Sequence, residues 1–232
     1  MINAFLFDFG QTLVDSSDGF REAEKIAETR IFSELGLESW SEFLAEYRRL
    51  RKDYQAQSNF SRATLWHDLY DHFGRESDRE SLIEMELEYW DVVKSNTRPF
   101  PETFMVLEQL SSNYRLGMIT NTQGQQSSDT HRMSLFPELE EFFEAIVVAG
   151  QDDIPPKPDP APFQFCLNSM NISPGEAIYV GDDWRIDICG AADVGLQPIW
   201  IKHHLVSCTW PNVETRVPVI TNLEQLLELA FW

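Results

Sequence analysis

The feature of this sequence that most constrains its fold is an alternation, beyond Pro99, between short apolar runs and helical segments. The runs occupy positions 116–119, 145–148, 178–180, 198–201 and 217–220. Such alternation is typical of a parallel sheet covered by helices. An earlier run, Ala4–Phe7, has the same character and ends at Asp8. We therefore predict an α/β fold with a Rossmann-like parallel sheet and helices on both of its faces.

The stretch between residues 16 and 95 has a different texture. Its apolar residues recur at helical spacing in four sets, which begin at Phe20, Trp40, Leu65 and Leu82. This pattern predicts a small four-helix bundle. Because the first strand belongs with the later ones, we interpret the bundle as an insertion. The predicted domains are a core of residues 1–15 and 96–232 and a helical domain of residues 16–95.

The charge balance of the chain excludes several kinds of partner. The 232 residues include 38 Asp and Glu against 18 Lys and Arg, which gives a formal net charge of −20. An acidic surface repels nucleic acid phosphates and anionic lipids, so we expect neither partner. No apolar run approaches the ~20 residues of a membrane-spanning helix, and the first residues lack a basic signal-peptide segment. We expect a cytoplasmic protein with reduced cysteines (Cys166, Cys189 and Cys208), and its oligomeric state stays open.

Polar side chains follow the predicted strands at the points where those strands end. In open α/β sheets the carboxyl ends of the strands meet at one edge, where active sites form. Clustered carboxylates repel one another unless a hard cation binds them, and Mg²⁺ is the first candidate. A lysine and hydroxyl groups suit an anionic phosphoryl group. The residues in question are Asp8, Gly10, Thr12, Thr120, Asn121, Lys157, Asp182, Asp183 and Asp187.

Taken in order, these residues resemble the four motifs of the haloacid dehalogenase superfamily of hydrolases, whose nucleophile is an aspartate. The four motifs are the stretches Phe7–Asp15, Ile119–Asn121, Lys157–Pro160 and Gly181–Asp187. Each motif alone is weak, but four in the right order, each after an apolar run, are specific. The helical insertion also matches the cap domain of that family.

The resemblance implies a role for each of these residues. Asp8 would attack phosphorus to form an aspartyl-phosphate, which water then hydrolyses. The substrate phosphoryl group would be bound by Thr12, Thr120, Asn121 and Lys157, and Lys157 would also assist catalysis. Mg²⁺ would be held by Asp8, Asp182 and the backbone carbonyl of Gly10, while Asp183 and Asp187 support these ligands from outside. The expected activity is Mg²⁺-dependent hydrolysis of a small phosphorylated compound.

One position departs from the family pattern. Two residues after the nucleophile, family phosphatases place a second Asp that protonates the leaving alcohol, and this chain has Gly10 there. General acid–base help is typically worth ~10²–10⁴ in rate. The first interpretation is therefore a phosphatase that acts poorly on alkyl phosphates and better on acyl or aryl phosphates.

Two other interpretations stay open. Phosphonatases and dehalogenases of the superfamily also lack the second Asp. A phosphonatase needs a Schiff-base lysine, for which Lys25 and Lys52 lie in no convincing motif, and dehalogenases lack the acidic fourth motif that this chain retains. The third interpretation is a binding or regulatory protein with little turnover.

Simpler structural roles also exist for some of these residues. Asp183 precedes a predicted helix and could cap its free N–H groups. His67, His72 and His131 lack metal-ligand spacing, so we predict that they are surface residues and that the chain binds no zinc.

Overall fold

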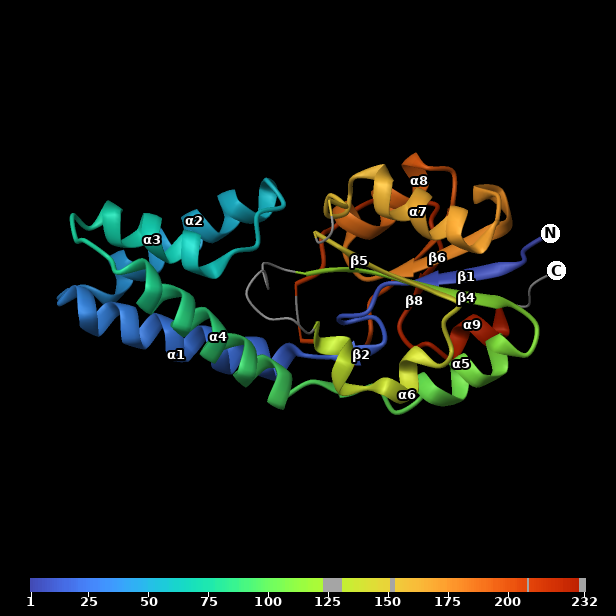
Figure 1. Ribbon diagram of the computed structural model, residues 1–232, viewed down its shortest axis with the longest axis horizontal. Coiled ribbons are helices and arrows are strands. Elements are labelled where there is room, and N and C mark those ends of the chain that lie inside the picture. The colour runs from blue at the N-terminus through green and yellow to red at the C-terminus, as the bar shows by residue number, and fades with distance from the viewer. Residues whose placement is uncertain (123–130, 151–152, 208, 230–232) are drawn as a thin grey trace. The chain divides into compact units, whose positions relative to one another are not determined.

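The computed structural model describes residues 1–122, 131–150, 153–207 and 209–229 (Figure 1). The chain forms two compact units. The first contains Met1–Ser17, residues 97–122 and the described residues beyond 130, and the second contains Asp18–Asn96. Of the three cysteines, Cys166 and Cys189 are free thiols, and Cys208 lies outside the described residues.

The first unit is built on a six-stranded parallel sheet of order β5-β4-β1-β6-β7-β8. Strand β1 lies inside the sheet and pairs with β4 on one side and β6 on the other. The chain therefore reverses the direction in which it adds strands at β1, which is the point where open α/β sheets form binding crevices. The bounds are β1 Ala4–Phe7, β4 Arg115–Asn121, β5 Ala145–Ala149, β6 Ala177–Gly181, β7 Gln197–Ile201 and β8 Val219–Ile220.

Helices cover both faces of this sheet, as Figure 1 shows. Helices α5 (Thr103–Ser111) and α9 (Gln225–Glu228) contribute Val106, Leu107, Leu110 and Leu226 to the core on one face. Helices α7 (Pro160–Met170) and α8 (Gly190–Asp193) contribute to the core on the other face, through Phe163, Cys166, Leu167, Met170 and Ala191. Because both faces are buried, the strands read as continuous apolar runs. The predicted α/β fold class is confirmed.

The shorter elements of the first unit complete the connections. A small antiparallel pair, β2 (Val14–Asp15) and β3 (Arg98–Pro99), joins the two points where the helical segment leaves and rejoins this unit. One predicted strand is shorter than expected, since Val217 and Pro218 precede β8 rather than belonging to it. The remaining elements are the one-turn helices η1 Arg132–Leu135, α6 Pro137–Glu140, η2 Pro174–Glu176 and η3 Trp184–Cys189.

The second unit consists of four helices around one apolar core, in agreement with the predicted periodicity. Side chains of Ser39, Ser61 and Asp78 accept hydrogen bonds from backbone N–H groups at the starts of α2, α3 and α4. Gly19 allows close packing, because a Cβ there would lie 2.8 Å from the Val93 carbonyl oxygen. The bounds are α1 Ser17–Leu35, α2 Trp40–Ala56, α3 Arg62–His72 and α4 Arg79–Ser95. That this unit acts as a cap stays a prediction. Across the described part of the chain, no helix is long and apolar enough to cross a membrane.

Candidate active site

The candidate site lies at the carboxyl ends of β1, β4 and β6. Asp8 directly follows β1, and its backbone N–H donates to the Val180 carbonyl of β6 at 2.9 Å. This bond fixes the start of the loop that follows the strand. The Asp8 side chain is almost fully buried, with 8% of the residue exposed. Its carboxylate therefore depends on its protein neighbours for solvation.

The main neighbour of Asp8 is Lys157, whose side chain is also buried. The Lys157 Nζ lies 2.7 Å from Asp8 Oδ1 and 2.7 Å from Asp187 Oδ1. The same nitrogen is 2.8 Å from the Ile119 carbonyl oxygen and 2.8 Å from the Tyr179 hydroxyl. Burial alone would lower the pKa of Lys157, but the charges of Asp187 and Asp8 outweigh it and raise this pKa above 10.5. Lys157 is thus a fixed cation between two carboxylates.

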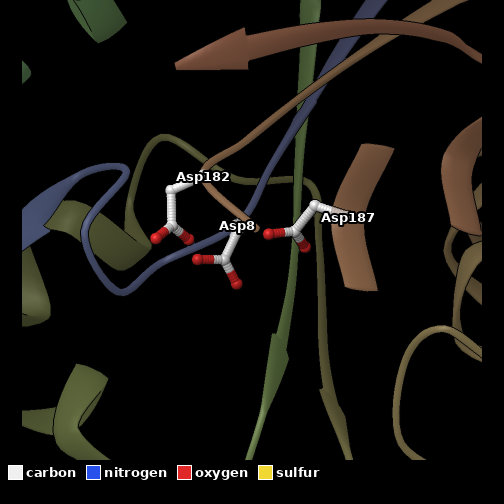
Figure 2. A group of neighbouring side chains, drawn as sticks. All are labelled: Asp8, Asp182 and Asp187. Carbon is white, nitrogen blue, oxygen red and sulfur yellow. The ribbon is translucent and has the colours of Figure 1, made fainter. Parts of the chain in front are cut away.

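Three carboxylates gather at this point, and Figure 2 shows their side chains. One oxygen from each of Asp8, Asp182 and Asp187 lies within 4.8 Å of the others. Burial, together with the charge of Asp187, raises the pKa of Asp8 from 3.8 to about 6, although Lys157 opposes the rise. Burial and the charges of Asp187 and Asp8 raise the pKa of Asp182 well above its usual value. One ammonium group does not balance three carboxylates, so the ionised cluster is energetically unfavourable.

These residues fit a hard divalent cation. Mg²⁺ prefers oxygen ligands and commonly binds through one or two carboxylates. Both Asp187 oxygens already accept hydrogen bonds: Oδ1 from Lys157 and from the Tyr179 hydroxyl at 3.0 Å, and Oδ2 from the Asp183 backbone N–H at 3.0 Å. Asp8 and Asp182 are therefore better placed than Asp187 to bind an ion directly. Binding by the Gly10 carbonyl stays a prediction.

Gly181 allows Asp187 to approach the end of β6. A Cβ at position 181 would lie 2.4 Å from the Asp187 Cβ and 2.8 Å from its Oδ2. No real side chain tolerates such contacts, so the glycine of the fourth motif is required by packing. The backbone N–H that holds Asp187 in turn belongs to Asp183.

The predicted phosphoryl-binding residues are buried around the same point. Thr12 is fully buried, and its hydroxyl has no hydrogen-bond partner among the described residues. A buried hydroxyl without a hydrogen-bond partner is uncommon in proteins, and it is explained when a ligand or a water molecule forms the hydrogen bond. Thr120, at the end of β4, is also buried, and its hydroxyl lies 3.4 Å from His131 Nε2. Substrate binding by both threonines stays a prediction.

Asn121 and Asp183 have roles within the protein itself. The Asn121 side chain accepts from the Lys157 backbone N–H at 2.9 Å and donates to the Lys157 carbonyl at 3.1 Å, so it positions the lysine. Asp183 Oδ1 accepts from the backbone N–H groups of Arg185 and Ile186, both at 2.8 Å, and thereby caps η3. The capping interpretation of Asp183 is confirmed. Its link to the site is its backbone N–H, which supports Asp187.

Sequence reasoning did not single out Tyr179 or Trp200, which both contact residues of this site. Tyr179 lies within β6 and bridges Lys157 and Asp187 through its hydroxyl, whose pKa is raised well above 10.0 by burial and by the charges of Asp187 and Asp8. The available signal was a tyrosine in an otherwise aliphatic strand, since a buried tyrosine hydroxyl usually finds a partner. Trp200 lies within β7, and its Nε1 donates to the Asp182 carbonyl at 2.8 Å.

The prediction that His131 is a surface residue is wrong. Only 7% of His131 is exposed, because its ring packs edge-on against Phe9 with 5.5 Å between centroids. Its Nδ1 accepts from the Met133 backbone N–H at 3.1 Å. The Nε2 nitrogen therefore carries the proton and donates to Thr120. Metal-ligand spacing was the wrong criterion, since it does not report on packing.

A parallel α/β sheet with a lysine-linked aspartate and two further carboxylates at its switch point has the arrangement expected of an α/β enzyme, whose active site forms at this edge of the sheet. The family comparison is specific. Residues 2–195 match the family model of the haloacid dehalogenase-like hydrolases. The chain belongs to this family, and it is therefore an enzyme of the hydrolase class.

Relatives and solved structures extend the match over nearly the whole chain. A glyceraldehyde 3-phosphate phosphatase of Methanothermobacter thermautotrophicus is 28% identical over 99% of this chain and 100% of its own. The Pyrococcus furiosus protein of the same name is 30% identical over 98% of this chain and 92% of its own. A 2-haloacid dehalogenase of Pseudomonas syringae superposes with a TM-score of 0.63 at 26% identity, over 99% and 98% of the two chains.

Proposed function

We propose that this protein is a Mg²⁺-dependent phosphatase that acts on a small phosphorylated metabolite through an aspartyl-phosphate intermediate at Asp8. The observation that carries the proposal is the 2.7 Å contact between Lys157 Nζ and Asp8 Oδ1, next to the carboxylate of Asp182. The contact holds a cation at the attacking group. An anionic nucleophile reaches an anionic phosphoryl group only when nearby cations offset their repulsion.

Each residue of the site has a separate role in the proposed mechanism. Asp8 forms the bond to phosphorus, and Lys157 offsets the charge that Asp8 and the phosphoryl group share. The Thr12 hydroxyl, which is buried without a partner in the described part of the chain, would donate to a phosphoryl oxygen. The hydroxyl of Thr120 would donate to another. Asn121, Tyr179 and Asp187 position the lysine.

Magnesium would be held by Asp8, Asp182 and the Gly10 carbonyl, with Asp187 supporting them. When bound, the ion neutralises negative charge on the phosphoryl group and orients it. The helical unit of residues 18–96 would act as the cap that closes over the substrate. The names of the relatives support a small phosphorylated metabolite as the substrate class.

Dehalogenation is the second candidate, favoured by Gly10 and by the dehalogenase structure that resembles this chain. The three clustered carboxylates argue against it, because in a metal-free dehalogenase the single charge of Lys157 would offset them only in part. Phosphonatase activity requires a desolvated cap lysine. Lys25 and Lys52 are both exposed within the helical unit, which argues against this activity. A purely regulatory role leaves the buried charges without a physical reason.

Two measurements test the proposal. Heating with Mg²⁺ and beryllium fluoride, a mimic of the aspartyl-phosphate, should raise the Tm of the wild type but not that of Asp8→Asn. Phosphate release from acetyl phosphate and p-nitrophenyl phosphate should require Mg²⁺ and disappear in Asp8→Asn. Release of halide from a 2-haloacid in EDTA, without any phosphate release, would replace the proposal with dehalogenation. Neither activity and no Tm response would favour the regulatory role.

A further inference from the structure

Arg132 lies beside the position from which the acid residue is missing. It begins η1, and only 1% of it is exposed. A Cβ built on Gly10 would lie 3.1 Å from Arg132 Nη2 and 3.8 Å from its Cζ. A side chain at position 10 would therefore point at this guanidinium group. The cation occupies the direction in which a second aspartate would extend.

The guanidinium group is held in place from two other sides. Its Nη1 donates to the Ser16 hydroxyl at 3.0 Å, and its Cζ lies 5.8 Å from the centre of the Phe9 ring. Ser16 in turn shares a hydrogen bond with Thr97 at 2.9 Å. Arg132 thus spans the loop that follows the nucleophile, from Phe9 to Ser16. A side chain fixed in this way loses little conformational entropy when it binds a substrate oxygen.

The chemistry of an arginine differs from that of the acid it would replace. Its guanidinium keeps its proton under all ordinary conditions, so it cannot protonate a leaving alcohol. It can donate strong hydrogen bonds to an oxygen that becomes an anion. Groups that stabilise charge as it develops in the transition state contribute to rate without transferring a proton.

Building on the proposed phosphatase function, we propose that Arg132 stabilises the leaving-group oxygen as an anion, in place of the acid that Gly10 lacks. Asp8 forms its bond to phosphorus while the bond from phosphorus to the leaving oxygen breaks. The electron pair of that bond stays on the leaving oxygen, which accepts hydrogen bonds from Arg132 and later takes a proton from water. A water molecule then cleaves the aspartyl-phosphate to give Asp8 and inorganic phosphate.

This mechanism selects a class of substrate. Leaving groups that are stable as anions, such as the carboxylate of an acyl phosphate or an acidic phenol, depart with little help. Alkoxides are poor leaving groups without a proton, so simple alkyl phosphates should react slowly. Arg132 should matter most between these extremes, where the leaving oxygen carries substantial charge and needs stabilisation.

The test compares leaving groups in variants of the whole chain. We would measure kcat/KM with Mg²⁺ for acetyl phosphate, p-nitrophenyl phosphate and phenyl phosphate in the wild type, Arg132→Gln and Arg132→Lys. Arg115→Gln is the control, because Arg115 is an exposed arginine paired with Glu144 on the surface of the same unit. Losing one donor to a developing oxyanion costs roughly 100-fold in rate. We expect a loss of this size for phenyl phosphate in Arg132→Gln.

The pattern of losses decides between the possible roles. For acetyl phosphate the same variant should lose less than about 3-fold, because its leaving group needs little stabilisation. Equal losses for all three substrates, or no loss, would overturn the inference and leave Arg132 a structural residue. If Arg132→Gln does not fold, Arg132→Lys, which keeps the charge but not the fork of donors, provides the same comparison. A wild type inactive on all three phosphates would refute the phosphatase function itself.

Discussion

Replacing Asp8 by asparagine should stabilise the metal-free protein. Burial, with the charge of Asp187, raises the pKa of Asp8 from 3.8 to about 6. The folded state therefore binds this proton more tightly than the unfolded state, and the free energy of unfolding of the wild type falls as the pH rises from about 4 to above 6. Ionisation of Asp8 lowers the free energy of unfolding by about 3 kcal/mol at pH 8 and by about 0.5 kcal/mol at pH 4.

Asparagine removes the charge but keeps an oxygen for Lys157 at the same place. We expect Asp8→Asn to exceed the wild type by about 3 kcal/mol at pH 8 in EDTA, and by less than about 1 kcal/mol at pH 4. Urea denaturation followed by circular dichroism measures both values. Asp193→Asn, which removes the charge of an exposed aspartate of α8, is the matched control and should not reproduce this gain in stability at pH 8.

Magnesium supplies a second comparison for the same pair of proteins. Added Mg²⁺ should stabilise the wild type at pH 8 and have a smaller effect on Asp8→Asn, since a ligand that binds only the folded state stabilises it. Stability gained at the expense of function is common at active sites. If Asp8→Asn is no more stable than the wild type at pH 8 in EDTA, then Lys157 fully compensates the buried charge and the reasoning fails.

Three further predictions concern the support of the site and the core of the first unit. Lys157→Met should lower the free energy of unfolding by about 3–5 kcal/mol at pH 8 in urea titrations, because it leaves buried carboxylates without their cation; an unchanged midpoint would contradict this role. Gly181→Ala should lower the free energy of unfolding by about 1–3 kcal/mol, because the added methyl group overpacks against Asp187. Gly175→Ala is the control and should have no such effect, because a Cβ at that position meets nothing within 4 Å. Equal Tm values for the two variants would exclude the clash. Burial lowers the pKa of His203 from 6.5, so protonation of this residue destabilises the fold as the pH falls below that value. In urea titrations, the free energy of unfolding of His203→Gln should therefore fall less than that of the wild type between pH 7.5 and pH 5. The same fall in both proteins would contradict this prediction.

The sequence predicted the elements well because periodicity reports local burial. The first strand has the predicted bounds, Ala4–Phe7, since its residues are buried on both faces of the sheet. The four helices of the second unit follow the predicted spacing of apolar residues for the same reason. The last strand is shorter than predicted, because an apolar run containing Pro218 does not by itself specify pairing.

The motifs predicted which residues gather at the ends of the strands, but not how their side chains contact one another. Lys157 and Asp8 are 149 positions apart, and no local pattern states that their side chains touch. Asn121 carries a family signature, yet its side-chain amide holds the backbone of Lys157. The sequence predicts only that Tyr179 is a strand residue. In the folded sheet, its hydroxyl lies between Lys157 and Asp187.

By itself the sequence determined an α/β fold, a helical insertion, the family, and the absence of an acid at position 10. The tertiary structure decided that Arg132 fills the space beside Gly10 and that Lys157 lies between two carboxylates. The physical reason is the distance along the chain over which each kind of information acts. The periodicity of apolar residues in a helix or strand indicates which side of that element is buried, and it involves only residues a few positions apart. Electrostatic contacts form between side chains that only the folded chain brings together, so their partners follow from packing and strand order.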